Sequence, residues 1–141
     1  MALTDHLSPR QIEILAALVD TIVPADDHPS GTEAGVLDYL DRQFAADLAH
    51  ARHGYRLGLE ALDAESRTVH GRPFAALLPG QREALLRTIE SQRAGGRWPV
   101  DPAAFLEDVV GHVMEGFYGD PAQGGNRDAV SWEMVGFQVT G

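Results

Sequence analysis

Two pairs of side chains have a spacing that would place metal-ligating groups on one face of a helix. His50 and His53 are three residues apart, and so are His112 and Glu115. Residues at positions i and i+3 of a helix are neighbours, and imidazole and carboxylate groups are ligands for zinc and iron. The spacing therefore predicts one alternative for this chain, a stand-alone helical enzyme with a metal ion on these four residues. The competing interpretation is solvent-facing histidines, because a pair alone is not a ligand set.

Other kinds of catalytic site find less support. The chain contains no cysteine and no lysine, which excludes cysteine nucleophiles, thiolate metal ligands and Schiff bases. No serine lies in a Gly-x-Ser-x-Gly turn. The glycines from Gly119 to Gly125 lack the preceding strand that a dinucleotide-binding fingerprint requires. Outside the four-residue alternative, we expect no catalytic residue, no metal and no cofactor in this chain.

The composition is that of an acidic globular protein. The chain has 141 residues, of which 44% are hydrophobic, and a formal net charge of −10. Such a charge disfavours binding to nucleic acid or to an anionic lipid surface. No apolar run approaches the roughly 18 residues that span a bilayer. We therefore expect one helical domain over residues 1–141, with its core at about residues 7–137, and no insertion into a membrane.

Hydrophobic periodicity predicts an all-α fold of five or six helices, with an irregular glycine-rich segment at the C-terminus. Ser8 and Pro9 form an N-terminal capping signal for the first helix, and Pro24 ends it. We expect Thr32 to cap the second helix. Its apolar face would consist of residues four apart, namely Val36, Leu40, Phe44 and Leu48.

The pattern blurs between residues 50 and 54, which leaves open either one long kinked helix or two helices. Gly71 is expected to end this helical region. The pair Asp101-Pro102 is expected to begin the last long helix, because it combines a capping residue with proline at the first turn. Between these, Pro79 is expected to begin a helix that Gly95-Gly96 ends.

The residue types in the segment from Phe117 to Phe137 are the ones that folding alone explains least. Phe117 and Tyr118 precede a stretch rich in glycine and proline, and Trp132 follows it. Glycine allows close backbone approach, and aromatic side chains beside such a loop either anchor its packing or bind a partner. Both interpretations stay open on these grounds.

The same segment resembles a known family. The stretches from Glu115 to Pro121 and from Gly124 to Asp128, followed by Trp132 and Gly136-Phe137, resemble the closing signature of the gluconate 2-dehydrogenase subunit 3 family. The resemblance covers nearly the whole chain, from Leu7 to Phe137.

The resemblance implies a non-catalytic small subunit of a sugar, sugar-acid or glycoside dehydrogenase. The partner would be a large FAD-binding subunit of the glucose–methanol–choline type, which this chain binds, stabilises and helps to mature. FAD would lie in that partner, and some complexes add a multihaem cytochrome c subunit. The glycine loop and the family motif together assign the partner contact to Phe117, Tyr118, Asp120, Pro121, Gly124, Gly125, Asn126, Trp132 and Phe137. A further alternative is a chaperone that leaves the flavoprotein after folding.

Members of this family commonly begin with a twin-arginine export signal, and the residues from Met1 to His6 show none. As it stands, the sequence predicts a cytoplasmic protein. If such a signal has been removed, a periplasmic protein is expected instead.

Overall fold

The computed structural model describes residues 2–119, and that part of the chain contains helices and no strand. The prediction of an all-α fold is confirmed. Three short 3-10 helices connect or precede the five α-helices. The α-helices are α1 (Pro9–Ile22), α2 (Val36–Phe44), α3 (Arg52–His70), α4 (Pro79–Glu90) and α5 (Pro102–Tyr118).

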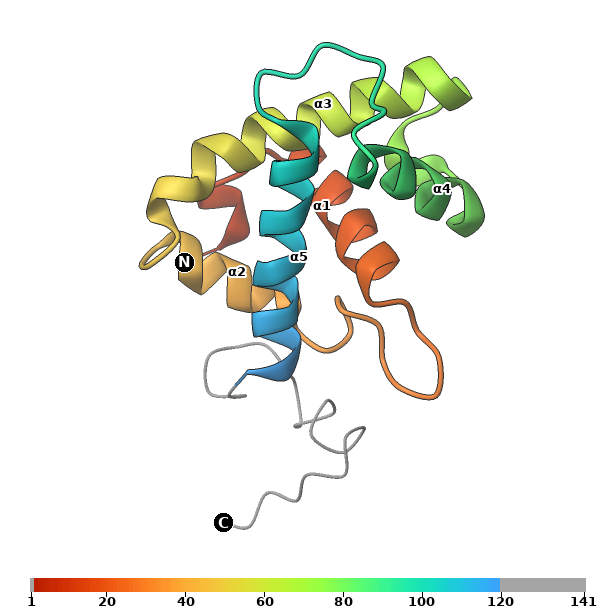
Figure 1. Cartoon of the computed structure of the whole chain (residues 1–141). Helices are drawn as coiled ribbons and strands as arrows, with labels where there is room; N and C mark the ends of the chain where they lie inside the picture. The colour runs from red at the N-terminus through yellow and green to blue at the C-terminus, as the bar shows by residue number, and fades with distance from the viewer. Residues whose placement is uncertain (1, 120–141) are drawn as a thin grey trace, which may run out of the picture.

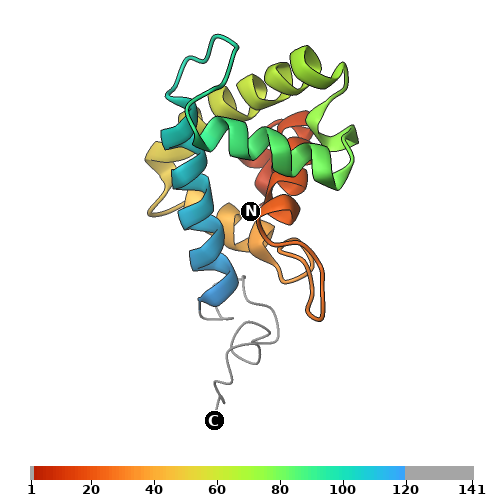
Figure 2. The same ribbon diagram turned by 45° about the vertical axis from the view of Figure 1, so that its right-hand side comes forward.

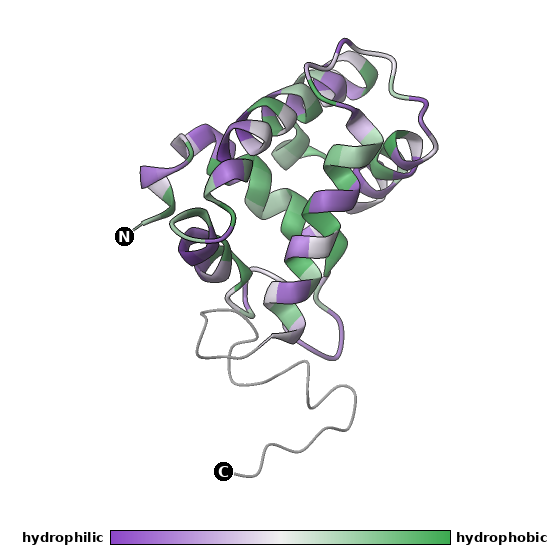
Figure 3. Ribbon diagram, turned by 60° about the vertical axis from the view of Figure 1, so that its left-hand side comes forward, coloured by the Kyte–Doolittle hydropathy of each residue, from purple (hydrophilic) through white to green (hydrophobic). Residues whose placement is uncertain are grey.

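Helix α5 occupies the centre of the fold and contacts each of the other four α-helices. The long helix α3 crosses one end of α5, α2 lies near the other end, and α1 and α4 lie along its side (Figures 1 and 2). The apolar sides of the helices meet in the middle, as the green segments of Figure 3 show. The α5 residues buried there are Phe105, Leu106, Val109, Val113 and Phe117. Helix α5 carries four of the residues that the sequence marked as candidates, namely His112, Glu115, Phe117 and Tyr118.

The first helix begins and ends as its sequence predicts. The Ser8 hydroxyl accepts the Gln11 amide at 3.1 Å, and the Gln11 side chain accepts the Ser8 amide at 3.0 Å. This reciprocal arrangement is a capping box, and Pro9 follows it at the first helical position. The helix ends at Ile22, two residues before Pro24.

The second helix begins three residues later than expected, at Val36 with Gly35 as its N-cap, so the assignment of Thr32 as its cap is wrong. The Thr32 amide and hydroxyl both donate to the Asp20 carboxylate of α1, at 2.8 and 2.7 Å. A separate turn intervenes and ends at Gly35, whose φ of 91° lies in the left-handed region that favours glycine. Asp20 is twelve residues away from Thr32, so a local sequence pattern could not predict that Thr32 would bind Asp20 instead of capping a helix.

The region from 36 to 70 forms two separate α-helices, α2 and α3. Helix α2 ends at Phe44, so Leu48 does not extend its apolar face, and a 3-10 helix at Ala49–Ala51 precedes α3. Val36, Leu40 and Phe44 are fully buried on the predicted face. At its other end, α3 stops at Gly71, which has the predicted left-handed conformation with φ 72°.

The expectation that Gly95-Gly96 ends the fourth helix is wrong. Helix α4 begins at Pro79 as expected but ends at Glu90, and Gln92 takes a positive φ of 61°. The two glycines instead bind a side chain of α3, as described below. Asp101 caps α5 as predicted, because its carboxylate accepts the Ala104 amide at 3.1 Å.

Candidate functional site

The C-terminal end of α5 carries the two predicted partner-binding residues that the structure describes. Phe117 is fully buried, and its ring lies 5.9 Å from that of His28 and 5.1 Å from that of Tyr118. Tyr118 is 43% exposed. Of the two, only Tyr118 presents its side chain to the surface, while Phe117 anchors this end of the helix. The other predicted residues, Asp120, Pro121, Gly124, Gly125, Asn126, Trp132 and Phe137, lie outside the described range.

One turn earlier, α5 is joined to α2. The Tyr39 hydroxyl donates to Glu115 Oε2 at 3.3 Å. Burial, together with the negative charge of Glu115, raises the pKa of Tyr39. Gly116 makes the approach of the ring feasible, since a Cβ there would lie 2.7 Å from Cδ2 of Tyr39. Glu115 is thus engaged in helix packing.

A pocket of about 380 Å³ lies between the start of α3 and the first half of α5, and we call it the α3–α5 pocket. Its apolar part is formed by Tyr55 and Phe105, whose rings meet edge to face at 6.1 Å, with smaller side chains beside them. Its polar groups come from two aspartates and two histidines. The complete lining is His50, Ala51, Gly54, Tyr55, Val100, Asp101, Ala104, Phe105, Asp108 and His112.

Tyr55 and His112 are coupled within this pocket. The Tyr55 hydroxyl lies 2.7 Å from His112 Nδ1, and the two rings stack at 5.8 Å with an interplanar angle of 17°. Burial, and then the negative charges of Asp108 and Glu115, raise the pKa of Tyr55. The hydroxyl therefore stays protonated at neutral pH and holds one side of the imidazole.

The four-residue metal alternative is wrong. His50 and His112 line the same pocket, but Glu115 binds Tyr39 and His53 is not part of the lining. Nowhere in residues 2–119 do three histidine, aspartate or glutamate side chains come close enough to hold one metal ion. The physical reason is that tyrosines of α2 and α3 take up Glu115 and His112 separately.

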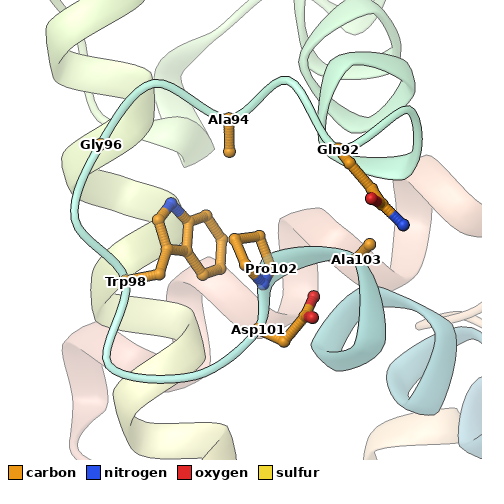
Figure 4. Close-up of a pocket in the computed structure, with 7 residues that line it drawn as sticks. All are labelled: Gln92, Ala94, Gly96, Trp98, Asp101, Pro102 and Ala103. Carbon is orange, nitrogen blue, oxygen red and sulfur yellow. The ribbon is translucent and has the colours of Figure 1, made fainter.

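A second pocket, of about 350 Å³, lies on the other side of Asp101 (Figure 4). The indole of Trp98 points toward Pro102 in this view, and Gln92 lies across the opening. Trp98 also contacts Phe105 of the α3–α5 pocket, with ring centroids 6.2 Å apart. The beginning of α5 thus has a hollow on each side of its capping residue.

The loop over this second pocket is held by a buried carboxylate. Glu65 of α3 is 4% exposed and accepts three hydrogen bonds, from the amides of Gly95 and Gly96 at 3.0 and 2.8 Å and from Trp98 Nε1 at 3.1 Å. Burial by itself would raise the pKa of Glu65, but these donors outweigh it and the pKa is lowered. Glu65 therefore fixes the loop that leads into α5.

Sequence reasoning missed Glu65 and the place of Asp108 in the pocket. A signal existed for Asp108, because positions 101, 104, 105, 108 and 112 follow the helical period on one side of α5. No such signal existed for Glu65, whose three donors lie 30 to 33 residues further along the chain.

Comparison with known proteins assigns nearly the whole chain to one family. A family model described as gluconate 2-dehydrogenase subunit 3 matches residues 9–140. Searches of curated proteins and of solved structures found no match to the chain. In the part of the chain that the structure describes, no helix is both long and apolar enough to cross a membrane.

Proposed function

Because the chain belongs to the gluconate 2-dehydrogenase subunit 3 family, we propose that it is the non-catalytic subunit of a dehydrogenase complex. In this proposal it binds the large FAD-containing catalytic subunit, of the glucose–methanol–choline type, stabilises it and helps it to mature. FAD resides in that partner, and hydride transfer from the sugar or sugar acid to flavin takes place there. Some complexes would add a multihaem cytochrome c subunit. The observation that carries the proposal is the family match over residues 9–140.

The hydrogen bonds of several acidic and histidine side chains support a non-catalytic role. The His112 ring contacts the Tyr55 hydroxyl, and the Glu115 carboxylate accepts a hydrogen bond from the Tyr39 hydroxyl. The buried carboxylate of Glu65 holds a loop by three hydrogen bonds. Asp63, likewise buried, accepts from two arginines and from a backbone amide. These four groups, which could otherwise act as acids, bases or ligands, are thus used to join helices and loops.

The partner contact in this proposal includes the end of α5 and the segment beyond it. Tyr118 is the exposed member, with 43% of its surface accessible, and Phe117 supports it from the core. The remaining proposed contacts are Asp120, Pro121, Gly124, Gly125, Asn126, Trp132 and Phe137. Aromatic side chains are the residues most often found at the centre of protein interfaces.

Affinity purification of the tagged chain from its native host tests the proposal. A co-purifying chain identified as a dehydrogenase, with flavin absorbance between about 350 and 500 nm, is the expected result. Haem bands would add the cytochrome subunit. A flavoprotein that needs the chain for its yield but does not stay bound would indicate a transient chaperone. A lone, colourless protein whose absence leaves dehydrogenase yield and activity unchanged would contradict the proposal.

The interface assignment needs its own test. Trp132→Ala and Phe137→Ala are expected to lower the yield of the complex while the isolated subunit remains folded. Unchanged yield and unchanged thermal stability of the complex would show that these residues are not part of the contact. Loss of solubility of the isolated subunit would mark them as packing residues instead.

A further inference from the structure

The α3–α5 pocket has an unbalanced charge. Asp101 and Asp108 both line it, and no arginine is among its lining residues. The ion pairs of the described chain involve other carboxylates, those of Asp41, Glu60, Asp63 and Glu83. Asp101 uses one oxygen to cap α5. The pocket therefore presents negative charge that the described part of this chain does not neutralise.

The inner surface of the same pocket is apolar and aromatic. Tyr55 is 3% exposed and Phe105 8% exposed, and their edge-to-face contact makes a firm wall. His112 stacks on Tyr55, which extends the aromatic surface toward the rim. The side chain that fits such a site has a long apolar stem and a cationic, planar end. Arginine has this combination, since it buries its stem, stacks on aromatic faces and pairs with carboxylates in a bidentate manner.

The geometry points to an arginine of the dehydrogenase subunit as the occupant of the α3–α5 pocket, with its stem on Tyr55 and Phe105 and its guanidinium at Asp108 and Asp101. This inference rests on the proposed function, which supplies the partner. The size of the pocket, about 380 Å³, is at the low end of the roughly 300–1,000 Å³ range of ligand pockets and suits one inserted side chain. Arginines inserted in this way are frequent hot spots of interfaces.

The apolar groove between α1, α4 and α5 is a weaker candidate for the same role. Leu106, Val110 and Met114 line it, and of the three charged residues at its edge Arg87 and Glu83 already form a pair 3.6 Å apart, which leaves only Glu90. No aromatic side chain of the described residues lines that groove, so it lacks the stacking surface that would select an arginine. The α3–α5 pocket differs because it combines two carboxylates that form no ion pair within the described chain with an aromatic wall, and this combination selects a cation with an apolar stem.

The test is the affinity of the purified chain for its purified dehydrogenase subunit, measured at pH 8 and at both low and high salt. Asp108→Asn is expected to weaken binding about tenfold at low salt, and to reduce the salt dependence. Ala104→Trp, which fills the pocket, is expected to weaken binding at both salt concentrations. Glu107→Gln is the matched control, since Glu107 is the exposed neighbour of Asp108 and lies outside the lining. Its affinity should stay within about twofold of the unaltered chain.

The outcomes separate this inference from the proposed function. If the unaltered chain binds the dehydrogenase and both pocket variants bind as well as it does, the inference is overturned while the proposed function stands. If the unaltered chain binds no dehydrogenase, both fall. Arg127→Gln could weaken binding as much as Asp108→Asn does, and the double variant could bind no more weakly than either single variant. That result would assign the pocket to this chain's own arginine. A change in the oligomeric state of the isolated chain on Asp108→Asn would assign it to a second copy. If Ala104→Trp does not fold, Asp108→Asn carries the test alone.

Discussion

Glu65 and Trp98 are 33 residues apart in sequence, and the indole Nε1 of Trp98 donates to the Glu65 carboxylate at 3.1 Å. The same carboxylate accepts two backbone amides of the loop before α5. A carboxylate with three donors serves as a fixed point for a segment that has no secondary structure of its own. This contact ties the loop that leads into α5 to helix α3.

Glu65→Gln is expected to destabilise the fold by about 2 kcal/mol, because an amide nitrogen would replace an acceptor that faces a donor in a buried place. Trp98 lies at the site, so its fluorescence is expected to shift toward that of an exposed indole. Denaturant unfolding followed by circular dichroism gives the free energy. Glu107→Gln, on the surface of α5, is the control and should cost less than about 0.5 kcal/mol. Equal stabilities for the two variants would show that the Glu65 contacts contribute nothing.

Stability is expected to fall with acid because of Asp63 and Glu65. Burial opposes ionisation of each, but it is outweighed by hydrogen bonds from Arg10, Arg67 and the Phe74 amide at Asp63, and by hydrogen bonds from Trp98 and two amides at Glu65. Both pKa values therefore lie below their ordinary values of 3.8 and 4.5. A lowered folded-state pKa contributes stability above the unfolded pKa and loses it as pH falls through the folded value. The loss is therefore expected from about pH 5 downward. Urea midpoints measured from pH 7 to pH 3 test this expectation.

The double variant Asp63→Asn, Glu65→Gln provides the comparison for the acid effect. Its stability should be lower at pH 7 and should change less between pH 5 and pH 3. If the double variant loses stability over that range as steeply as the unaltered chain, other carboxylates cause the acid sensitivity.

Gly58→Ala is expected to destabilise the fold by about 1–3 kcal/mol, because a Cβ at this position of α3 would collide with the ring of Phe105 in α5. Gly54 lies one turn earlier in the same helix, with nothing within 4 Å of a Cβ. Gly54→Ala should leave stability unchanged or raise it by about 0.5–1 kcal/mol, since alanine has the higher helix propensity. Thermal unfolding of the pair isolates the steric effect, and similar melting temperatures would refute the close packing of α3 on α5.

Gly116→Ala and Gly111→Ala form a second matched pair, on α5. A Cβ at Gly116 would lie 2.7 Å from the ring of Tyr39, whereas one at Gly111 meets nothing within 4 Å. We expect the first substitution to cost about 1–3 kcal/mol and the second to be neutral or stabilising. Because Gly116 adjoins Phe117 and Tyr118, Gly116→Ala should also weaken binding of the dehydrogenase subunit. If Gly111→Ala destabilised the fold and Gly116→Ala did not, the close contact of Gly116 with Tyr39 would be refuted.

Local patterns determined the helices and most of their ends. The capping box of Ser8 and Gln11, the left-handed Gly71 and the cap at Asp101 act within four residues of themselves, so a periodic pattern with start and stop residues is sufficient. The closing motif from Glu115 to Phe137 likewise identified the family, which the match over residues 9–140 confirmed.

Only the tertiary structure decided what several other polar side chains do. Thr32 was expected to cap a helix but binds Asp20, and Gly95-Gly96 were expected to end one but bind Glu65. His112 and Glu115 have a spacing that suits a metal, yet they contact tyrosines from two different helices. In each case the partner is far away in sequence, and a partly buried hydrogen bond to that partner replaces a local preference worth about 1 kcal/mol. Spacing establishes which groups can share a face, and only packing determines what they meet there.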